Sequence, residues 1–81
     1  MNIPDEFAYR HPATLHVFRF FAFEHFTEPL KTLSMYSYHL AVAMIKELPD
    51  GPELTAGLRK LLEAKDCFVR AGLDIVKPAD A

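Results

Sequence analysis

The sequence predicts an all-α protein: an antiparallel helical hairpin preceded by a short N-terminal helical or irregular segment. The main observation is a chain reversal at 48–52, Leu-Pro-Asp-Gly-Pro, between two long stretches of helical periodicity. Proline lacks an amide donor and glycine permits positive φ, so a helix that reaches this reversal must end there. The apolar stripe that follows needs an apolar partner, and the preceding helix is the nearest candidate.

The N-terminal third of the chain divides at Pro12. Residues 1–12 contain two prolines and are expected to form an irregular arm. Residues 13–26, ATLHVFRFFAFEHF, carry both the alternation of a strand and an approximate helical spacing. We predict a short helix over 13–26 because two clear helices follow it, with a strand as the alternative.

The first long helix is predicted over residues 28–48, with Thr27 as its N-cap. Its middle part, Leu-Ala-Val-Ala-Met-Ile at 40–45, is apolar on every face, so it should be buried on every face. One stripe at spacings of three and four residues runs along the whole helix: Leu30, Leu33, Tyr36, Leu40, Met44 and Leu48.

The second long helix is predicted over residues 52–72. Asp50 is placed to cap its start, and Gly72 is expected to stop it, which leaves 73–81 as a frayed tail. Its stripe is apolar except for one lysine: Leu54, Leu58, Leu61, Lys65 and Phe68, widened by Leu62 and Val69.

Self-association is expected because the chain has more apolar surface than two helices can cover. A domain of 81 residues buries only a modest core. The hairpin partner covers one side of the first helix, and five phenylalanines between 18 and 26 need cover as well. We therefore predict a homo-oligomer whose interface includes Phe18, Phe21, Val42 and Ile45.

Composition excludes several classes of protein. A hydrophobic content of 51% is too high for a disordered chain, and a net charge of −2 argues against a general DNA or RNA binder. The one cysteine cannot form an internal disulfide, which fits a reducing compartment. No signal peptide or membrane span is evident, so we expect a soluble cytoplasmic protein without a membrane partner.

Catalytic and metal-binding patterns are missing from the sequence. The four histidines are never three or four residues apart, and no acidic residue completes a ligand pattern with them. Cys67 has no base near it in the sequence, and there is no glycine-rich phosphate loop. We expect a protein that is not an enzyme and that needs no metal or cofactor.

Two features suggest ligand binding. In Tyr9-Arg10-His11 an aromatic ring that can stack on a base stands beside a cation that can meet a phosphate. The alternative is that Tyr9 anchors the arm while Arg10 is solvated. Lys65 lies where a leucine would be expected, so it either keeps its ammonium in water by snorkelling or points into a cleft between subunits.

Two segments carry a resemblance to known proteins. Residues 11–26 and 48–73 resemble small proteins encoded by bacteriophages of actinobacteria, most specifically at Leu-Arg-Lys-Leu-Leu-Glu-Ala-Lys-Asp, 58–66. More remotely, the chain is similar to the phage helical-hairpin sponges that defeat CBASS and Thoeris immunity. The shared features are an aromatic-His-Pro element before the hairpin, a long first helix, a proline-rich acidic turn and a leucine-rich second helix.

The resemblance implies a function without catalysis. Sponges form oligomers and sequester cyclic nucleotide signals without cleaving them, so the ligand here would be a cyclic oligonucleotide or a cyclic ADP-ribose isomer. It implies Tyr9 as a base stacker and Arg59 and Lys65 as phosphate contacts, beside Arg10 and His11 from the N-terminal cluster. The phenylalanine-rich segment departs from the sponge pattern and could fill or cover such a pocket.

Two other functions remain open at this stage. The chain could be a phage effector that binds and inhibits or redirects a host protein through its phenylalanine-rich surface. It could also be a virion or assembly component, for which oligomerisation alone would be the function.

Overall fold

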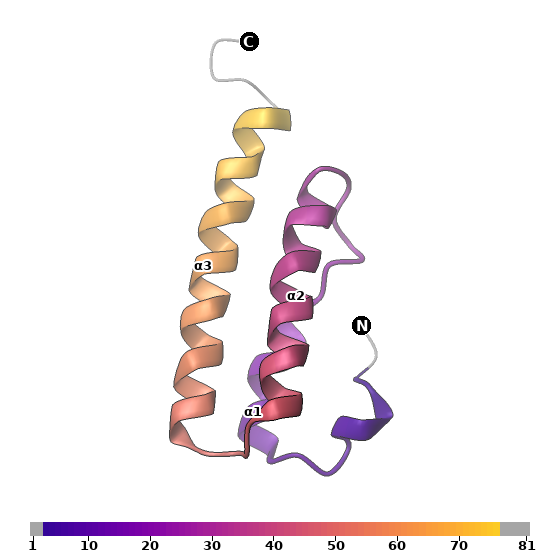
Figure 1. Ribbon diagram of the computed structural model, residues 1–81. Coiled ribbons are helices and arrows are strands. Elements are labelled where there is room, and N and C mark those ends of the chain that lie inside the picture. The colour runs from indigo at the N-terminus through magenta and orange to yellow at the C-terminus, as the bar shows by residue number, and fades with distance from the viewer. Residues whose placement is uncertain (1–2, 77–81) are drawn as a thin grey trace.

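Two long helices, packed side by side, make up most of the protein. The computed structural model describes residues 3–76, and its regular structure in that range is entirely helical. The elements are 3₁₀ turn η1 (Asp5–Phe7), helix α1 (Pro12–Phe18), 3₁₀ turn η2 (Arg19–Phe21) and helices α2 (Leu30–Glu47) and α3 (Pro52–Val76). Figure 1 shows α3 running back alongside α2, with α1 near the turn that joins them. The prediction of an all-helical fold is confirmed.

The N-terminal segment is helical where the sequence was ambiguous. Pro12 opens α1 at a position that needs no amide donor, and η2 continues the segment to Phe21. The predicted helix over 13–26 is therefore too long, and the strand alternative is wrong. Helical spacing places Phe18 and Phe21 on one side, where both are fully buried, whereas alternation would have put them on opposite faces.

Helix α2 begins two residues later than predicted. Its N-cap is Pro29, without a side-chain hydrogen bond, so the assignment of Thr27 as the cap is wrong. The carboxylate of Glu28 accepts hydrogen bonds from the backbone N–H and the hydroxyl of Thr32 instead, at 2.9 and 2.7 Å. That side chain satisfies a first-turn donor which the helix itself leaves unpaired.

Helix α3 does not stop at Gly72, contrary to the prediction. Gly72 has no positive φ and is buried, and a Cβ atom there would lie 2.7 Å from Leu33 Cδ1 and 2.8 Å from Leu30 Cδ2. Glycine is used here for the close approach of α2 and not to end the helix. Leu73–Val76 of the predicted tail are helical, and 77–81 lie outside the described residues.

The core lies between the N-terminal segment and one side of the α2–α3 pair. It consists of Phe7, Val17, Phe18, Phe21, Ala41, Ile45, Leu54 and Leu58. The rings of Phe7 and Phe18 meet edge to face, with centroids 5.7 Å apart. The predicted interface role of Phe18, Phe21 and Ile45 is therefore wrong, because the chain buries all three itself, and Val42 packs partly buried against the same core.

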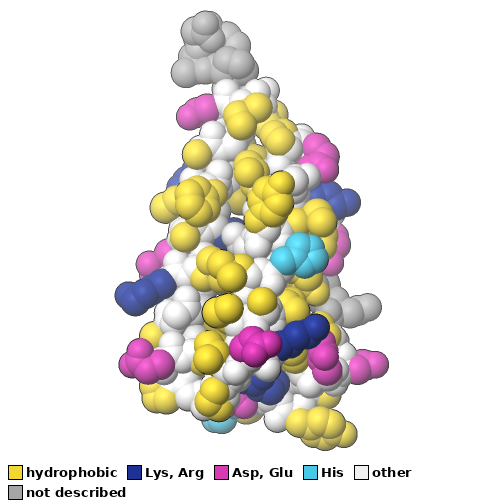
Figure 2. Space-filling view, in the orientation of Figure 1, with side chains coloured by type: hydrophobic (Ala, Val, Ile, Leu, Met, Phe, Trp, Pro, Cys, Tyr) yellow, Lys and Arg dark blue, Asp and Glu magenta, His cyan; other side chains and the backbone are white. Residues whose placement is uncertain are grey.

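The opposite side of the α2–α3 pair is apolar and open. We call it the α2–α3 groove. Figure 2 shows apolar side chains gathered over both helices on the face turned toward the viewer. Two adjoining hollows of about 260 and 310 Å³ lie along the groove. Its main lining residues are Leu33, Tyr36, Leu40, Met44, Leu48, Gly57, Leu61 and Phe68. None of the helices in residues 3–76 is both long enough and apolar enough to cross a membrane.

Candidate functional site

Arg10 fastens the N-terminal arm to the end of α2. Its Nη2 donates to the carbonyl of Leu48 at 2.7 Å, and its Nη1 donates to the carbonyl of Ile45. Ile45 lies in the last turn of α2 and Leu48 is its C-cap, where the helix leaves carbonyl oxygens unpaired and its dipole favours a positive charge. The guanidinium thus caps α2 from outside, across 35 to 38 residues of sequence.

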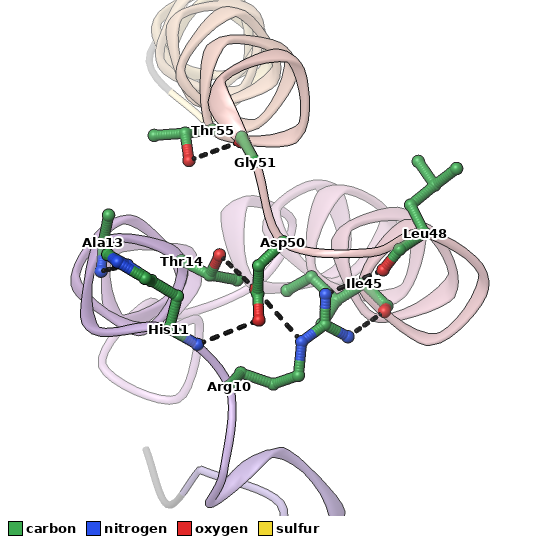
Figure 3. Close-up of polar contacts among 9 residues, drawn as sticks. All are labelled: Arg10, His11, Ala13, Thr14, Ile45, Leu48, Asp50, Gly51 and Thr55. Atoms are coloured by element: carbon green, nitrogen blue, oxygen red, sulfur yellow. Dashed lines mark hydrogen bonds and ion pairs between the residues drawn. The ribbon is translucent and has the colours of Figure 1, made fainter.

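Asp50 joins the arm, α1 and the interhelical turn (Figure 3). Its carboxylate accepts hydrogen bonds from Thr14 Oγ1 at 2.7 Å, the His11 backbone N–H at 3.0 Å and Arg10 Nε at 3.1 Å. The Thr14 hydroxyl, followed by the His11 amide and the Arg10 guanidinium, lowers the pKa of Asp50 below its ordinary value of 3.8. These donors come from the arm and α1, so the carboxylate binds the N-terminal segment where the sequence suggested a cap for α3.

His11 ends the arm and starts α1. Its Nδ1 accepts a hydrogen bond from the backbone N–H of Ala13 at 3.0 Å, so the imidazole is the N-cap of the helix. The bond uses the lone pair of Nδ1 and leaves Nε2 as the nitrogen available to a ligand. The side chain is exposed.

A hollow of about 520 Å³ lies between α1 and the first two turns of α3. Its volume falls in the range of small-molecule sites, roughly 300–1,000 Å³. Its polar and charged lining side chains are His11, Thr14, Asp50, Thr55 and Arg59, and the remaining residues are small or apolar: Ala13, Gly51, Pro52 and Ala56.

The hollow has an available positive charge. The carboxylate of Asp50 is paired with Arg10, whereas none of the ion pairs found among residues 3–76 involves Arg59. A guanidinium can bind a phosphate through two parallel N–H donors, and an imidazole and hydroxyls can add further hydrogen bonds. The arrangement suits an anionic ligand that also has a flat apolar part.

Tyr9 projects from the arm next to Arg10. The side chain is 98% exposed, so Tyr9 does not anchor the arm as the alternative interpretation required. Arg10 anchors the arm and the Tyr9 side chain is exposed, which is the reverse of that interpretation. An exposed ring beside a fixed element is a surface on which a base can stack.

Lys65 lies apart from the hollow. The residue is 5% exposed, and its ammonium donates to the carbonyls of Phe20 at 2.7 Å and Ala22 at 3.4 Å. Its Nζ also lies 5.7 Å from the ring centroid of Phe26, and burial lowers its pKa. The lysine neither snorkels into water nor points into a cleft. It ties η2 and the residue that follows it to α3.

The structure therefore divides the predicted ligand residues. His11 and Arg59 line one hollow, Arg10 holds the arm beside it, Tyr9 is exposed two residues before His11, and Lys65 is elsewhere. Asp50, Thr14 and Thr55 were not predicted as site residues. Their partners are 36 to 40 residues away in the cases of Asp50 and Thr14, so no local spacing marks them.

Metal-ligating side chains are dispersed in residues 3–76. No three His, Cys, Asp or Glu side chains in this range are grouped so that they could hold a metal ion. Cys67 is a free, exposed thiol, and Arg70 Nη2 lies 3.4 Å from its Sγ.

Comparison with known proteins adds no relative. Neither the family models, nor the curated proteins, nor the solved structures contained a match to this chain.

Proposed function

We propose that the protein is a non-enzymatic counter-defence protein of a bacteriophage, which sequesters a cyclic nucleotide immune signal between its copies. The observation that carries this proposal is the hollow beside the arm, with Arg59 free of ion pairs among the described residues and His11 on its rim. The phosphates of the ligand would meet Arg59, and a base would stack on Tyr9.

The open shape of the hollow supports binding between copies. A single chain forms the hollow between α1 and α3 but leaves it partly open to solvent, and the Tyr9 side chain is almost fully exposed. A second copy would close the hollow or add its own ring to it. Lys65 is left out of the proposed ligand contacts because two backbone carbonyls already occupy its ammonium.

Isothermal titration calorimetry with cyclic dinucleotides, cyclic trinucleotides and cyclic ADP-ribose isomers tests the proposal. We expect binding to at least one of them, and recovery of the intact compound after the protein is denatured. Intact recovery separates sequestration from cleavage. No heat and no thermal shift with any member of the panel would exclude a sponge.

Arg59→Gln is the decisive variant, and Arg70→Gln is its matched control. Both remove one positive charge from an exposed position of α3, but only Arg59 lines the hollow. Losing charged hydrogen bonds to a phosphate should raise the dissociation constant about 10- to 100-fold for Arg59→Gln. Equal effects of both substitutions would show that only net charge matters.

A host-protein effector is the second candidate, and the apolar α2–α3 groove favours it. The phenylalanine-rich surface first considered for this role is not available, because Phe18 and Phe21 are in the core. Phe20, which lies between them in the sequence, is about half exposed. An assembly role would use self-association without a ligand.

A further inference from the structure

Asp50 has one hydrogen-bond acceptor position left over. Its Oδ1 accepts hydrogen bonds from Thr14 Oγ1 at 2.7 Å and Arg10 Nε at 3.1 Å. Its Oδ2 accepts one from the His11 backbone N–H at 3.0 Å, and no second donor to Oδ2 is found within residues 3–76. Each carboxylate oxygen has two lone pairs, so one lone pair of Oδ2 is unused. The side chain lines the hollow between α1 and α3 and is 30% exposed, so a ligand in the hollow can reach it.

The hydroxyl groups of the same hollow are acceptors toward a ligand. Thr14 Oγ1 donates its one hydrogen to Asp50, and Thr55 Oγ1 donates its hydrogen to a backbone carbonyl at 3.1 Å. Both oxygens keep lone pairs but have no hydrogen left for a phosphate. Among the described residues that line the hollow, Arg59 alone carries a positive charge at neutral pH, so an anionic group must bind there.

The unused acceptor and the unpaired cation lie at different levels along α3. Asp50 belongs to the turn before the helix, whereas Arg59 follows Pro52, the first residue of α3, by seven positions, a rise of about 10 Å. The lining residues of α3 between these levels, Thr55 and Ala56, are small. A ligand that spans the hollow therefore has its anionic group at Arg59 and a hydrogen-bond donor at Asp50.

The charges around Asp50 decide which donor suits it. Hydrogen bonds, first of all from the Thr14 hydroxyl, lower the pKa of Asp50, so the carboxylate is ionised at neutral pH and repels a second phosphate. Arg10 already balances that charge at 3.1 Å, so the ligand needs no positive charge of its own. A neutral N–H group suffices, and the exocyclic amine of a base such as adenine supplies one. Tyr9 adjoins Arg10 in the sequence, so the ring on which a base would stack is at the same end of the hollow.

We infer that Asp50 is a specificity-determining residue: the unused lone pair of its Oδ2 accepts an N–H from the base of a ligand whose phosphate binds Arg59. The inference rests on the proposed function for the phosphate at Arg59 and the base on Tyr9. It adds the direction in which the ligand lies, with the phosphate toward the middle of α3 and the amine toward the turn. It also adds a chemical requirement, because a base without an amine leaves this acceptor unpaired.

Two nucleotides that differ only in the exocyclic amine test the inference without any substitution. They are adenosine 5′-monophosphate (AMP) and purine riboside 5′-monophosphate. NMR titration of the full chain, labelled with ¹⁵N and kept at neutral pH, measures the dissociation constant of each. The wild type should bind AMP about tenfold more tightly, which is the effect of one hydrogen bond to a charged acceptor.

Asp50→Asn and the matched control Arg10→Met separate recognition from attachment of the arm. Each removes one partner of the Arg10–Asp50 ion pair, so each should loosen the arm. Asparagine should turn its amide oxygen toward the two donors at Oδ1 and its NH₂ group to the side of Oδ2, where it opposes the amine of the ligand. The tenfold preference for AMP should therefore disappear in Asp50→Asn and persist in Arg10→Met, while both variants bind AMP less tightly than the wild type.

Three results would overturn the inference. One is a wild type that binds the two nucleotides equally or binds neither, and this result decides even where Asp50→Asn does not fold. Another is an unchanged preference in Asp50→Asn while circular dichroism shows the variant to be folded. The third is loss of the preference in Arg10→Met as well, which would leave Asp50 with the attachment of the arm alone.

The outcome for the sponge is separate. No binding in the calorimetric panel, together with a preference for AMP that depends on Asp50, would exclude the sponge and support the inference. Binding of a cyclic nucleotide, together with equal binding of AMP and purine riboside 5′-monophosphate, would support the sponge and overturn the inference.

Discussion

The two sides of the α2–α3 pair have similar composition and different surroundings. One side holds Ala41, Ile45 and Leu58, and α1 and η2 cover it with Val17, Phe18 and Phe21 until all are nearly inaccessible. The other side holds Tyr36, Leu40, Met44 and Phe68, each at least 38% exposed. Apolar residues on a helix are therefore not equivalent; what decides their exposure is whether a neighbouring segment reaches them.

The comparison also reassigns the phenylalanines. A dense aromatic segment looks like a surface for partners, yet here two of its rings stabilise the chain that carries them. The surface left for partners is the less conspicuous stripe of α2 and its counterpart on α3.

Truncating one aromatic ring on the covered side of the α2–α3 pair and one on the open side should distinguish a core residue from a surface residue. Phe18→Ala should lower the free energy of unfolding by about 3–5 kcal/mol, because it opens a cavity in the core. Tyr36→Ala should change it by less than about 0.5 kcal/mol at concentrations where the chain is a single copy. Urea unfolding followed by circular dichroism measures both. Similar losses at the two positions would contradict the division into a covered and an open side.

The attachment of the covering segment depends on Arg10. Arg10→Met keeps much of the apolar stem and removes the bonds to the carbonyls of Ile45 and Leu48. Charged hydrogen bonds of this kind imply a loss of about 1–3 kcal/mol in the free energy of unfolding. Arg19→Met is the control, because that exposed guanidinium lies over the Phe20 ring at 5.0 Å and contributes less than about 1 kcal/mol. An equal loss in the control would remove Arg10 as the anchor.

Acid should loosen the same attachment through Asp50. Its folded-state pKa lies below the ordinary 3.8, so the folded protein binds the proton less readily than the unfolded chain does. The stabilisation is present above pH 3.8 and is lost as the pH falls through the folded-state value. Asp50→Asn should be less stable than the wild type at neutral pH and should lose less stability between about pH 5 and about pH 2. Parallel stability curves for the two proteins would show that the carboxylate is not engaged.

Alanine substitutions at two glycines of α3 should give the smallest changes in the free energy of unfolding, and the two substitutions are chemically identical. Gly57→Ala should raise the free energy of unfolding of the single copy by about 0.5–1 kcal/mol, because helix propensity improves and nothing obstructs the methyl group. Gly72→Ala has the same propensity gain, but Leu30 and Leu33 must move, so we expect no gain or a loss of about 1 kcal/mol. Thermal unfolding of both variants at low concentration checks the sign. A larger gain at Gly72 than at Gly57 would reverse the assignment of the packed and the open glycine.

Local sequence signals predicted some features of the candidate site and missed others. His11 was named from the cluster Tyr9-Arg10-His11, and Arg59 was named as a phosphate contact that the resemblance to the sponges implies. Asp50 could not be named in either way, because its role depends on donors from a segment some 36 to 40 residues earlier. Lys65 was recognised as unusual by its place in an apolar stripe, but the carbonyls that hold it belong to the turn after α1.

The sequence by itself determined the helices and the reversal between them, because prolines, glycine and apolar periodicity act over a few residues. It could not determine which side of α2 would be covered, since both sides are apolar and periodicity says nothing of distant segments. The tertiary structure decided that α1 and η2 lie over Ile45 and not over Leu40. It also decided that side chains of α2 pack closely against Gly72, whereas none packs closely against Gly57. Packing of segments far apart in sequence makes that choice, because burial depends on the neighbours that the fold supplies.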